Sequence, residues 1–450
     1  MAYPTIVYNA STGSDTLASG AGPSSALTGT SADASATTVI DLDGTPDLSG
    51  VDATGLDVLF LATAGGSRKL YKIVGVNDGA DQVTIDQSVS VTAVNWAIGG
   101  KRLTLEADTS NPDIDDLRSG WIMELEAGTY TMTVTSTIAT GDTTDGPVTI
   151  QAASAASPII DGTNSINTLT ITVGLVKLLG DLTIRADANR ECIRSNGDNK
   201  FHLFGTTLDY SDTGAIGLAA TDNVKGSFTN VHFSGGANGT DGYQQVGSDR
   251  VNIHFENCTF DGGDRGIELA SVSSFSSMSV NGCVFDSQDA EGISFTGSSL
   301  YNVSIQRSTF YGAGADGITS SVLSVAQLVT VRNCIFEANG GYGIDAAANS
   351  DFTWDVDYNA DYNNTSGVYN NLTAGANDVN LSGSAFTNAA SDDFSLNNTA
   401  GQGADCRAAG FPGALTSHGT GFADIGALQH QDAGGGSASG VRNPTGGPIA

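Results

Sequence analysis

Short segments in the middle of the chain place an apolar residue at every second position. Residues 251–255 (VNIHF), 303–305 (VSI) and 329–331 (VTV) are examples. A period of two residues is typical of a β-strand with one buried face. Gly, Asn, Asp, Ser and Thr fill the intervals, and no stretch of this region keeps the apolar stripe of a helix. The pattern predicts an all-β protein.

The segments recur as a repeat of about two dozen residues, each with a Phe and, after a polar turn, a Gly-Ile pair. Phe260, Phe285, Phe310 and Phe336 follow one another at an almost constant step of about 25 residues. The Gly-Ile pairs that begin at positions 266, 292, 317 and 343 keep the same step. Two independent landmarks with one period indicate a structural unit. The same register reaches back to Phe233.

We predict that each copy is one turn of a parallel β-helix, in which strands stack about 4.8 Å apart along the axis. Equivalent positions of successive turns then become neighbours. The predicted core is a column of rings formed by Phe233, Phe260, Phe285, Phe310 and Phe336. Cys258, Cys283 and Cys334 share a second buried register. The Gly before each Ile is expected to make a corner with positive φ.

Changes in composition divide the chain into five predicted parts. Residues 1–36, rich in Ala, Ser, Thr and Gly, are expected to form an extended N-terminal arm. Residues 37–105 alternate strand patterns with turn signals and predict a small β-rich docking domain. Residues 106–386 are assigned to the β-helix and 387–431 to a C-terminal cap. Residues 432–450 form a Gly- and Pro-rich tail.

The charge balance limits the possible partners. With 49 acidic and 18 basic side chains the net charge is -31, which argues against a nucleic-acid or anionic membrane surface. The five cysteines have no Cys-x-x-Cys spacing, so we expect reduced, buried thiols. The first residues, MAYPT, lack a basic leader and an apolar run, and we expect synthesis in a cytoplasm without membrane insertion.

The repeat resembles the right-handed parallel β-helix superfamily, which includes pectate lyases, polysaccharide hydrolases, bacterial surface proteins and bacteriophage tailspikes. The Asn-Cys-x-Phe and Gly-Ile copies carry this resemblance over residues 180–345. The segments 393–396 (DFSL) and 424–429 (DIGALQ) are similar to terminal caps of bacterial and viral members. The order of arm, small β-domain and coil is similar to phage virion proteins. That resemblance implies a homotrimer located in the virion.

Paired carboxylates are the first candidates for chemistry, because glycoside hydrolysis needs two of them roughly 5 to 9.5 Å apart. Asp261 and Asp286 follow the core Phe in adjacent turns, and Asp209 has the same register. Asp is also a preferred turn residue after a strand, and this structural reading is favoured. We therefore treat Asp261 and Asp286 as fallback catalytic candidates. The lyases of the superfamily use an acidic calcium cluster beside a base, and no lyase residue is transferred.

From the remaining motifs we predict no cofactor and no metal site. Residues 355–363 (DVDYNADYN) imitate the oxygen spacing of a calcium loop, but the sixth position lacks Gly and Ser366 replaces the bidentate Glu. The histidines show no ligand spacing, and there is no P-loop or dinucleotide fingerprint.

Three functions remain open at this level. The preferred one is a bacteriophage virion structural protein, a β-helix spike, fibre or capsid-decoration subunit, without catalysis. Its expected partners are other virion proteins through the N-terminal region, further copies in a homotrimer and a cell-surface polysaccharide. The alternatives are a tailspike-like glycoside hydrolase or lyase acting on polysaccharide, and a non-catalytic bacterial adhesin.

Overall fold

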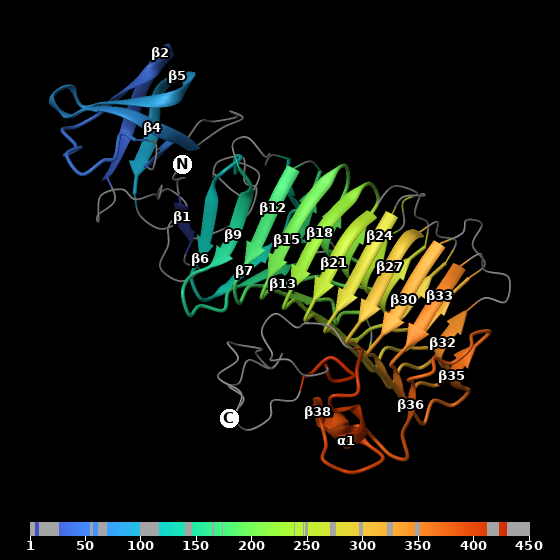
Figure 1. Ribbon diagram of the computed structural model, residues 1–450. Coiled ribbons are helices and arrows are strands. Elements are labelled where there is room, and N and C mark those ends of the chain that lie inside the picture. Colours follow the sequence, from blue (N-terminus) through green and yellow to red (C-terminus); the bar gives the residue numbers. More distant parts are fainter. Residues whose placement is uncertain are drawn as a thin grey trace. The chain divides into compact units, whose positions relative to one another are not determined.

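The computed structural model of the protein describes most of the chain (Figure 1). The described residues are 5–8, 27–54, 57–61, 70–99, 117–139, 146–163, 166–172, 174–237, 239–245, 247, 251–270, 276–296, 300–321, 327–346, 352–411 and 423–429. The predicted tail at 432–450 lies outside them. The chain forms two compact units, residues 1–206 and 207–450, and each is described by itself.

The first unit contains a small antiparallel sheet with its own core. Its strands, in the order β2-β5-β3-β4, are β2 (Leu27–Leu42), β5 (Gln82–Ile98), β3 (Val58–Leu61) and β4 (Leu70–Asn77). A short 3-10 helix, η1 (Asp78–Ala80), joins β4 to β5. Trp96, Ile98 and Leu59 are buried between the strands. This is the small β-domain that the sequence predicts ahead of the coil.

The predicted N-terminal arm is corrected in two places. β2 begins at Leu27 and pairs with β5, so residues 27–36 belong to the small sheet. β1 (Thr5–Tyr8) pairs in parallel with β6 (Ile122–Leu125) and so joins the β-helix. The first part of β2, residues 27–36, was not predicted because most of its side chains are exposed or half-buried and its pairing with β5 is interrupted by bulges.

The same unit contains rungs of a parallel β-helix, each with one strand in each of three sheets, named here sheets 1, 2 and 3. Sheet 1 follows the order β1-β6-β9-β12-β15, sheet 2 the order β7-β10-β13 and sheet 3 the order β8-β11-β14. The remaining strands are β7 (Thr129–Met132), β8 (Ser136–Ile138), β9 (Val148–Ala152), β10 (Ile159–Gly162), β11 (Leu169–Ile171), β12 (Gly174–Leu179), β13 (Thr183–Arg185), β14 (Glu191–Ser195) and β15 (Asn199–Phe204).

The second unit repeats the three-sheet rung. In sheet 1 its strands are β18 (Val224–Thr229), β21 (Val251–Glu256), β24 (Ser276–Asn281), β27 (Leu300–Gln306), β30 (Gln327–Arg332) and β33 (Phe352–Asp357), which lie side by side in Figure 1. In sheet 2 they are β16 (Thr207–Asp209), β19 (His232–Gly236), β22 (Thr259–Gly262), β25 (Val284–Asp286), β28 (Thr309–Tyr311), β31 (Ile335–Glu337), β34 (Ala360–Tyr362) and β36 (Val379–Asn380).

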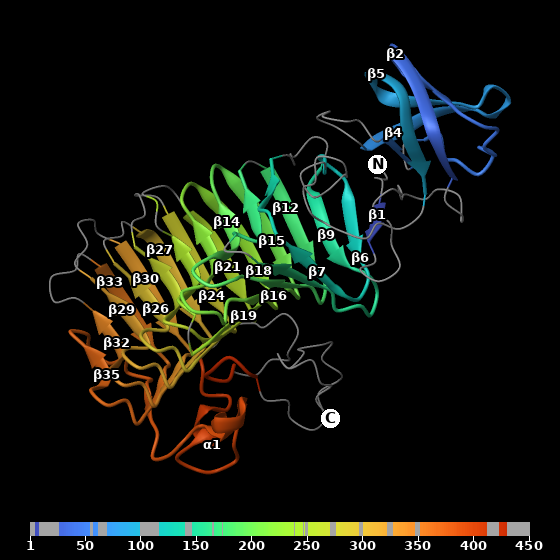
Figure 2. The ribbon, with the colours of Figure 1, turned by 180° about the vertical axis from the view of Figure 1, so that it is seen from behind.

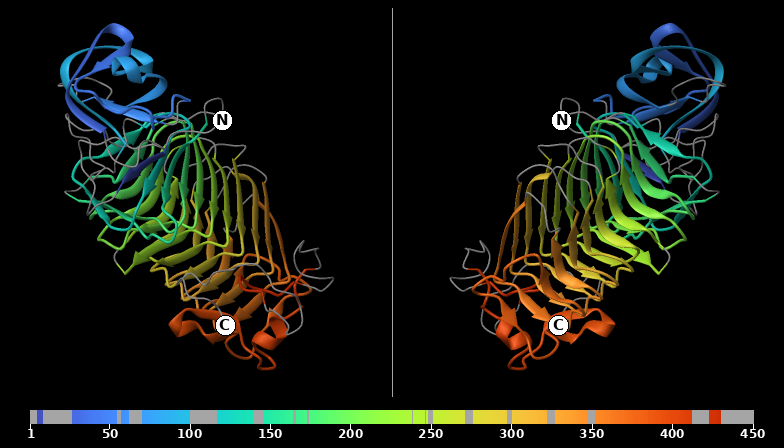
Figure 3. Two further views of the ribbon diagram at one scale, coloured as in Figure 1. Left: turned by 90° about the vertical axis from the view of Figure 1, so that its left-hand side faces the viewer. Right: turned by 90° about the vertical axis from the view of Figure 1, so that its right-hand side faces the viewer.

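Sheet 3 of the second unit completes each rung. Its strands are β17 (Ile216–Ala220), β20 (Asp241–Gln245), β23 (Arg265–Leu269), β26 (Ile293–Phe295), β29 (Ile318–Ser320), β32 (Tyr342–Ala346) and β35 (Gly367–Asn370). The last four follow one another in the view from behind (Figure 2). In the two side views of Figure 3, neighbouring strands of a sheet follow one another in a row. The fold is the predicted right-handed parallel β-helix.

The predicted aromatic column is confirmed. Adjacent rings of the column stack nearly parallel, with centroid separations of 4.4, 4.6, 4.7 and 5.0 Å from Phe233 through Phe260, Phe285 and Phe310 to Phe336. These separations match the strand spacing of a sheet, about 4.8 Å. All five rings are fully buried.

The Gly-Ile glycines have a different role from the one predicted. None of Gly266, Gly292 and Gly317 has a positive φ, so the predicted left-handed corner is wrong. A Cβ on Gly292 would lie 2.6 Å from the carbonyl oxygen of Gly317 and 2.7 Å from the ring of Phe310. Glycine is needed at this position because the aromatic column and the next strand leave no room for a side chain.

Left-handed backbone occurs instead at the residue that precedes each Cys or its equivalent. Asn257, Asn333 and Arg307 have φ of 52°, 58° and 48° there, and Gly282 has 65°. Asn and Gly adopt this conformation most readily, which explains why they recur in this register.

The cysteines behave as the sequence predicts. All five are free and buried. Burial raises the pKa of Cys334 to about 12, so its thiol stays protonated. In the described part of the chain no helix is long and apolar enough to cross a membrane.

The C-terminal segment of the second unit packs against the outer face of sheet 2. It contains β37 (Phe386–Asn388), the 3-10 helix η3 (Ala389–Ser391), β38 (Asp393–Leu396) and α1 (Gly403–Cys406), drawn in orange to red in Figure 1. Its apolar side chains form a cluster with Val284, Ile335 and Ala360 of β25, β31 and β34. We call residues 381–411 and 423–429 the C-terminal cover, because they cover a side of the coil.

Candidate functional site

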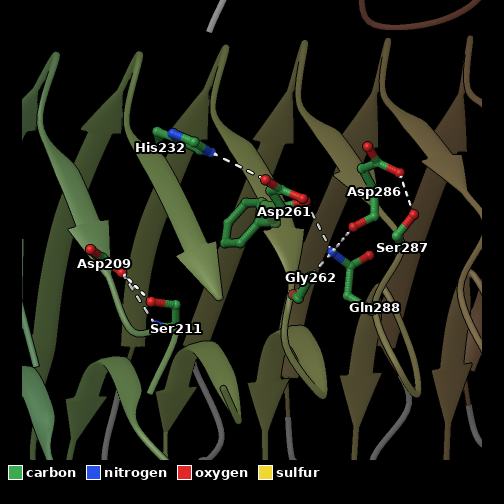
Figure 4. Close-up of polar contacts among 9 residues, drawn as sticks. Asp209, Ser211, His232, Asp261, Gly262, Asp286, Ser287 and Gln288 are labelled. Atoms are coloured by element: carbon green, nitrogen blue, oxygen red, sulfur yellow. Dashed lines mark hydrogen bonds and ion pairs between the residues drawn. The ribbon is translucent and has the colours of Figure 1, made fainter. Parts of the chain in front are cut away.

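The predicted carboxylate pair lies on the outer face of sheet 2. Asp261 and Asp286 are direct partners in the pairing of β22 with β25 (Figure 4). Asp209 is separated from Asp261 by the strand that carries Ser234, and its carboxylate accepts a hydrogen bond from the Ser211 hydroxyl at 2.8 Å. The structure therefore brings together Asp261 and Asp286 and leaves Asp209 apart.

The two members of the pair have different surroundings. The Asp261 side chain is 51% exposed, and its Oδ2 lies 3.9 Å from Nε2 of His232. Asp286 is 6% exposed and accepts a hydrogen bond from the Ser287 hydroxyl at 2.7 Å. Burial, with smaller contributions from the neighbouring carboxylates Asp261 and Asp392, raises the pKa of Asp286 to about 7.

The C-terminal cover explains this difference. Asp392 directly follows η3, and its negative charge is one of the influences that raise the pKa of Asp286. On the next strand the Tyr311 ring packs edge-on against Phe386 and Phe394, with centroids 6.1 and 5.5 Å away. The cover therefore ends between the two carboxylates, with Asp286 beneath it and Asp261 outside.

A further acid lies under the cover two strands beyond Asp286. Glu337 is 3% exposed, and its Oε2 accepts a hydrogen bond from the backbone N–H of Ala385 at 3.0 Å. Burial raises the pKa of the Glu337 carboxyl. The outer face of sheet 2 thus holds two buried acids at its contact with the cover.

A second charged cluster, which the sequence analysis missed, surrounds Arg265 on sheet 3. The Arg265 Nε lies 2.9 Å from Oε2 of Glu291. Its Nη1 lies 3.6 Å from Oδ1 of Asp241 and 3.8 Å from Oε1 of Glu268. One guanidinium therefore faces three carboxylates, which come from three successive turns.

Gln244 connects two of these carboxylates. Its Nε2 donates to Oδ2 of Asp241 at 2.7 Å and to Oε2 of Glu268 at 2.9 Å. Asp241 is 1% exposed, and burial is the main reason that its pKa is raised to about 7. The negative charge of Glu268 raises this pKa further, whereas the positive charge of Arg265 opposes the shift.

The repeat period contained the signal for this cluster. Asp241 is the direct partner of Arg265 in the pairing of β20 with β23, one turn earlier in the chain. Glu291 lies one turn after Arg265, and Glu268 lies on the same strand as Arg265. One turn of this coil is about 25 residues long. No single turn is rich in acids beside Arg265, so the sequence indicates no acidic partner for this base, whereas the structure gives it three acids from three successive turns.

Two acids of the imitated calcium loop contact other side chains of the protein. Asp355 of the imitated calcium loop pairs with Arg332 at 2.8 Å. Asp357 of the same motif accepts a hydrogen bond from Asn377 at 2.9 Å. Within the described ranges, no group of three or more His, Cys, Asp or Glu side chains is placed to hold a metal ion.

The comparisons with known proteins agree with the fold. Residues 191–365 match the family model described as right handed beta helix region. Its three parallel sheets give the chain a right-handed parallel β-helix fold. No curated protein matches the chain.

Three solved structures are similar to it. An alginate lyase from Paenibacillus sp. str. FPU-7 is 14% identical with a TM-score of 0.35, and the match covers 58% of this chain and 95% of that one. The tailspike protein gp49 from Pseudomonas phage LKA1 is 12% identical with a TM-score of 0.17, covering 75% and 60%. The catalytic domain of a GH87 alpha-1,3-glucanase is 10% identical with a TM-score of 0.20, covering 74% and 90%.

Proposed function

We propose that the chain is a structural protein of a bacteriophage virion, a β-helix spike, fibre or capsid-decoration subunit that binds a cell-surface polysaccharide without cleaving it. The burial of Asp286 is the observation that supports a function without cleavage. A glycosidic bond must lie between two carboxyl groups for either retaining or inverting hydrolysis. Asp261 is open to solvent and Asp286 is beneath the C-terminal cover, so a sugar chain reaches only one of them.

The proposed assembly is a homotrimer that docks to other virion proteins through its N-terminal region. The small antiparallel sheet supports this assignment, because it has a hydrophobic core of its own and forms a module distinct from the rungs. The net charge of -31 supports a location away from nucleic acid.

A polysaccharide assay tests the proposed function. The full chain is incubated with a panel of purified bacterial surface polysaccharides, and binding is measured by co-sedimentation and cleavage by the size distribution of the products. We expect binding to at least one polysaccharide and no shortening of any. Shortening that the Asp261→Asn variant abolishes would overturn the proposal.

The Arg265 cluster does not favour cleavage either. Asp241 is 1% exposed, so a sugar chain reaches it no more than it reaches Asp286. If the panel reveals cleavage, an Asp241→Asn variant should therefore retain it, as should Asp212→Asn, a change at an exposed turn of the same unit. Loss of cleavage in Asp241→Asn alone would show that the cluster is a cleavage site.

A further inference from the structure

Six side chains of β12 and β15, which lie side by side in Figure 1, point outward from sheet 1 in the first unit. The residues that alternate with them, such as Val176, Leu178 and Leu203, are fully buried. Successive side chains of a strand point to opposite faces, so the six lie together on the outer surface. We call them the basic patch. Its three directly paired couples are Leu175 with Lys200, Lys177 with His202, and Leu179 with Phe204.

The basic patch is positively charged, although the net charge of the chain is -31. None of its six side chains is acidic, and two of them are lysines. Among the described residues, neither Lys177 nor Lys200 forms an ion pair with a carboxylate. Both ammonium groups therefore remain available to an anion from solution.

The carboxylates of this region lie at the borders of the patch. Asp181 follows β12 and accepts a hydrogen bond from the Ser157 hydroxyl. Asp198 precedes β15. Glu124 on β6 is separated from the patch by β9, and its Oε2 accepts a hydrogen bond from Gln151 at 3.0 Å. The strand segments that carry the two lysines thus have no acid on their outer face.

Phe204 adds an aromatic ring to the patch. Its side chain is 46% exposed, and it is the aromatic member of the large hydrophobic residues that remain exposed in the described part of the first unit. Leu179, its direct partner, is half-buried. The apolar face of such a ring packs well on the C–H groups of a sugar ring.

His202 lies between the lysines and Phe204. Burial and the positive charge of Lys177 lower the pKa of His202, so its imidazole is neutral at pH 7. A neutral imidazole both donates and accepts hydrogen bonds, as sugar hydroxyls do.

This combination favours a sugar chain with acidic groups over other anions. The lysines can form charge-assisted hydrogen bonds with carboxylate or phosphate groups. A nucleic acid duplex carries about one charge per 1.7 Å, and a chain of net charge -31 repels such a dense polyanion. A sugar chain carries fewer charges and can contact the patch alone.

We infer that the basic patch of sheet 1 binds an anionic sugar chain, with Lys177 and Lys200 holding its acidic groups and Phe204 packing on a sugar ring. The inference rests on the proposed function, because it names the charge class of the bound polysaccharide and the face that binds it.

Binding of the full chain to carboxymethyl-dextran tests this site, with uncharged dextran as the matched neutral polymer. Biolayer interferometry at pH 7 measures the dissociation constant. We expect binding to carboxymethyl-dextran alone. Lys177→Gln combined with Lys200→Gln should raise the dissociation constant about tenfold, and Phe204→Ala should raise it about fivefold.

Lys72→Gln is the matched control, because it removes the same charge from β4 of the small sheet and should leave the dissociation constant unchanged. If the double variant fails to fold by circular dichroism, Lys200→Gln, at an exposed position, takes its place. No binding to carboxymethyl-dextran, equal binding to both polymers, or a folded double variant that binds as tightly as the unmodified protein would overturn the inference.

The panel of bacterial surface polysaccharides, measured with the same variants, separates the inference from the proposed function. If a panel polysaccharide binds and the double variant retains that binding, the inference fails and the proposed function stands. If the double variant loses binding to carboxymethyl-dextran and no panel polysaccharide binds, the inference stands and the proposed binding of a cell-surface polysaccharide fails.

Discussion

At the scale of single residues, stacking along the coil decides which side chains are allowed. The phenylalanine column was predictable because one residue type recurs at one period and a buried ring packs well on a copy of itself. The glycine column was also visible in the sequence, but its cause was not. The sequence shows that position 292 lacks a side chain. Only the structure shows that Phe310 and the next strand fill the space that a side chain would need.

Gly292→Ala tests this cause. We expect a loss of about 1 to 3 kcal/mol in the free energy of unfolding, because the new methyl group overlaps a ring and a carbonyl oxygen. Gly79→Ala is the matched control, since the nearest atom to its added methyl group, Asn77 Oδ1, is 4.0 Å away. Urea unfolding of both variants measures the difference. Equal stabilities would contradict the packing explanation.

Phe285→Ala tests the aromatic column itself. Removal of a fully buried ring that stacks on two others should cost about 3 to 5 kcal/mol. Phe285→Leu, which retains most of the apolar volume, should cost clearly less. Thermal unfolding followed by circular dichroism compares the two. A Phe285→Ala protein as stable as the unmodified one would mean that this ring is not in the core.

At the scale of elements, the strands of the coil and the presence of a C-terminal unit at 387–431 were predictable, but the place where this unit packs was not. The strands show a two-residue period, and the period of the repeat aligns them. The cover has no repeat, and its apolar residues, such as Phe386 and Phe394, lie among polar ones. Nothing in that pattern indicates that they pack on the side of sheet 2, against Tyr311. The burial of Asp286 could therefore not be predicted from the sequence.

The cover should make stability depend on pH through Asp286. Its pKa is raised from 3.8 to about 7, so the folded state holds the proton more tightly than the unfolded state does. The stabilisation is fully present below about pH 4 and is lost as the pH rises through about 7. The buried carboxyl of Glu337 acts in the same direction.

Asp286→Asn isolates this contribution. Relative to the unmodified protein, the variant should gain stability between pH 5 and pH 8, by roughly 1 to 3 kcal/mol at the upper end. Melting temperatures across this range measure the gain, with Asp212→Asn as a control expected to show none. A difference that stays constant with pH would show that Asp286 ionises as readily in the folded protein as in the unfolded one.

At the scale of the whole molecule, the excess of acids dominates the electrostatics. A net charge of -31 opposes compaction, and salt screens this repulsion over roughly 10 Å at 0.1 M. Composition alone makes this effect predictable. The distribution of charge over the outer faces cannot be predicted from composition, because it depends on the register of every strand. The Arg265 cluster, which was not predicted, is an example.

Raising the sodium chloride concentration from about 20 mM to about 200 mM should therefore raise the melting temperature by a few degrees. Choline chloride at equal ionic strength should have the same effect, because screening depends on ionic strength and not on the identity of the cation. A fall in melting temperature would mean that attractive ion pairs, such as those of Arg265, outweigh the general repulsion.

The C-terminal cover divides the candidate carboxylate pair, with Asp286 buried beneath it and Asp261 exposed outside it. Carbodiimide labelling of carboxyl groups in the native protein, with peptide mass spectrometry, measures it directly. We predict rapid labelling of Asp261 and protection of Asp286 and Glu337, with all three labelled after unfolding. Labelling of Asp261 and Asp286 at equal rates in the native protein would contradict the account and return the pair to the candidates for catalysis.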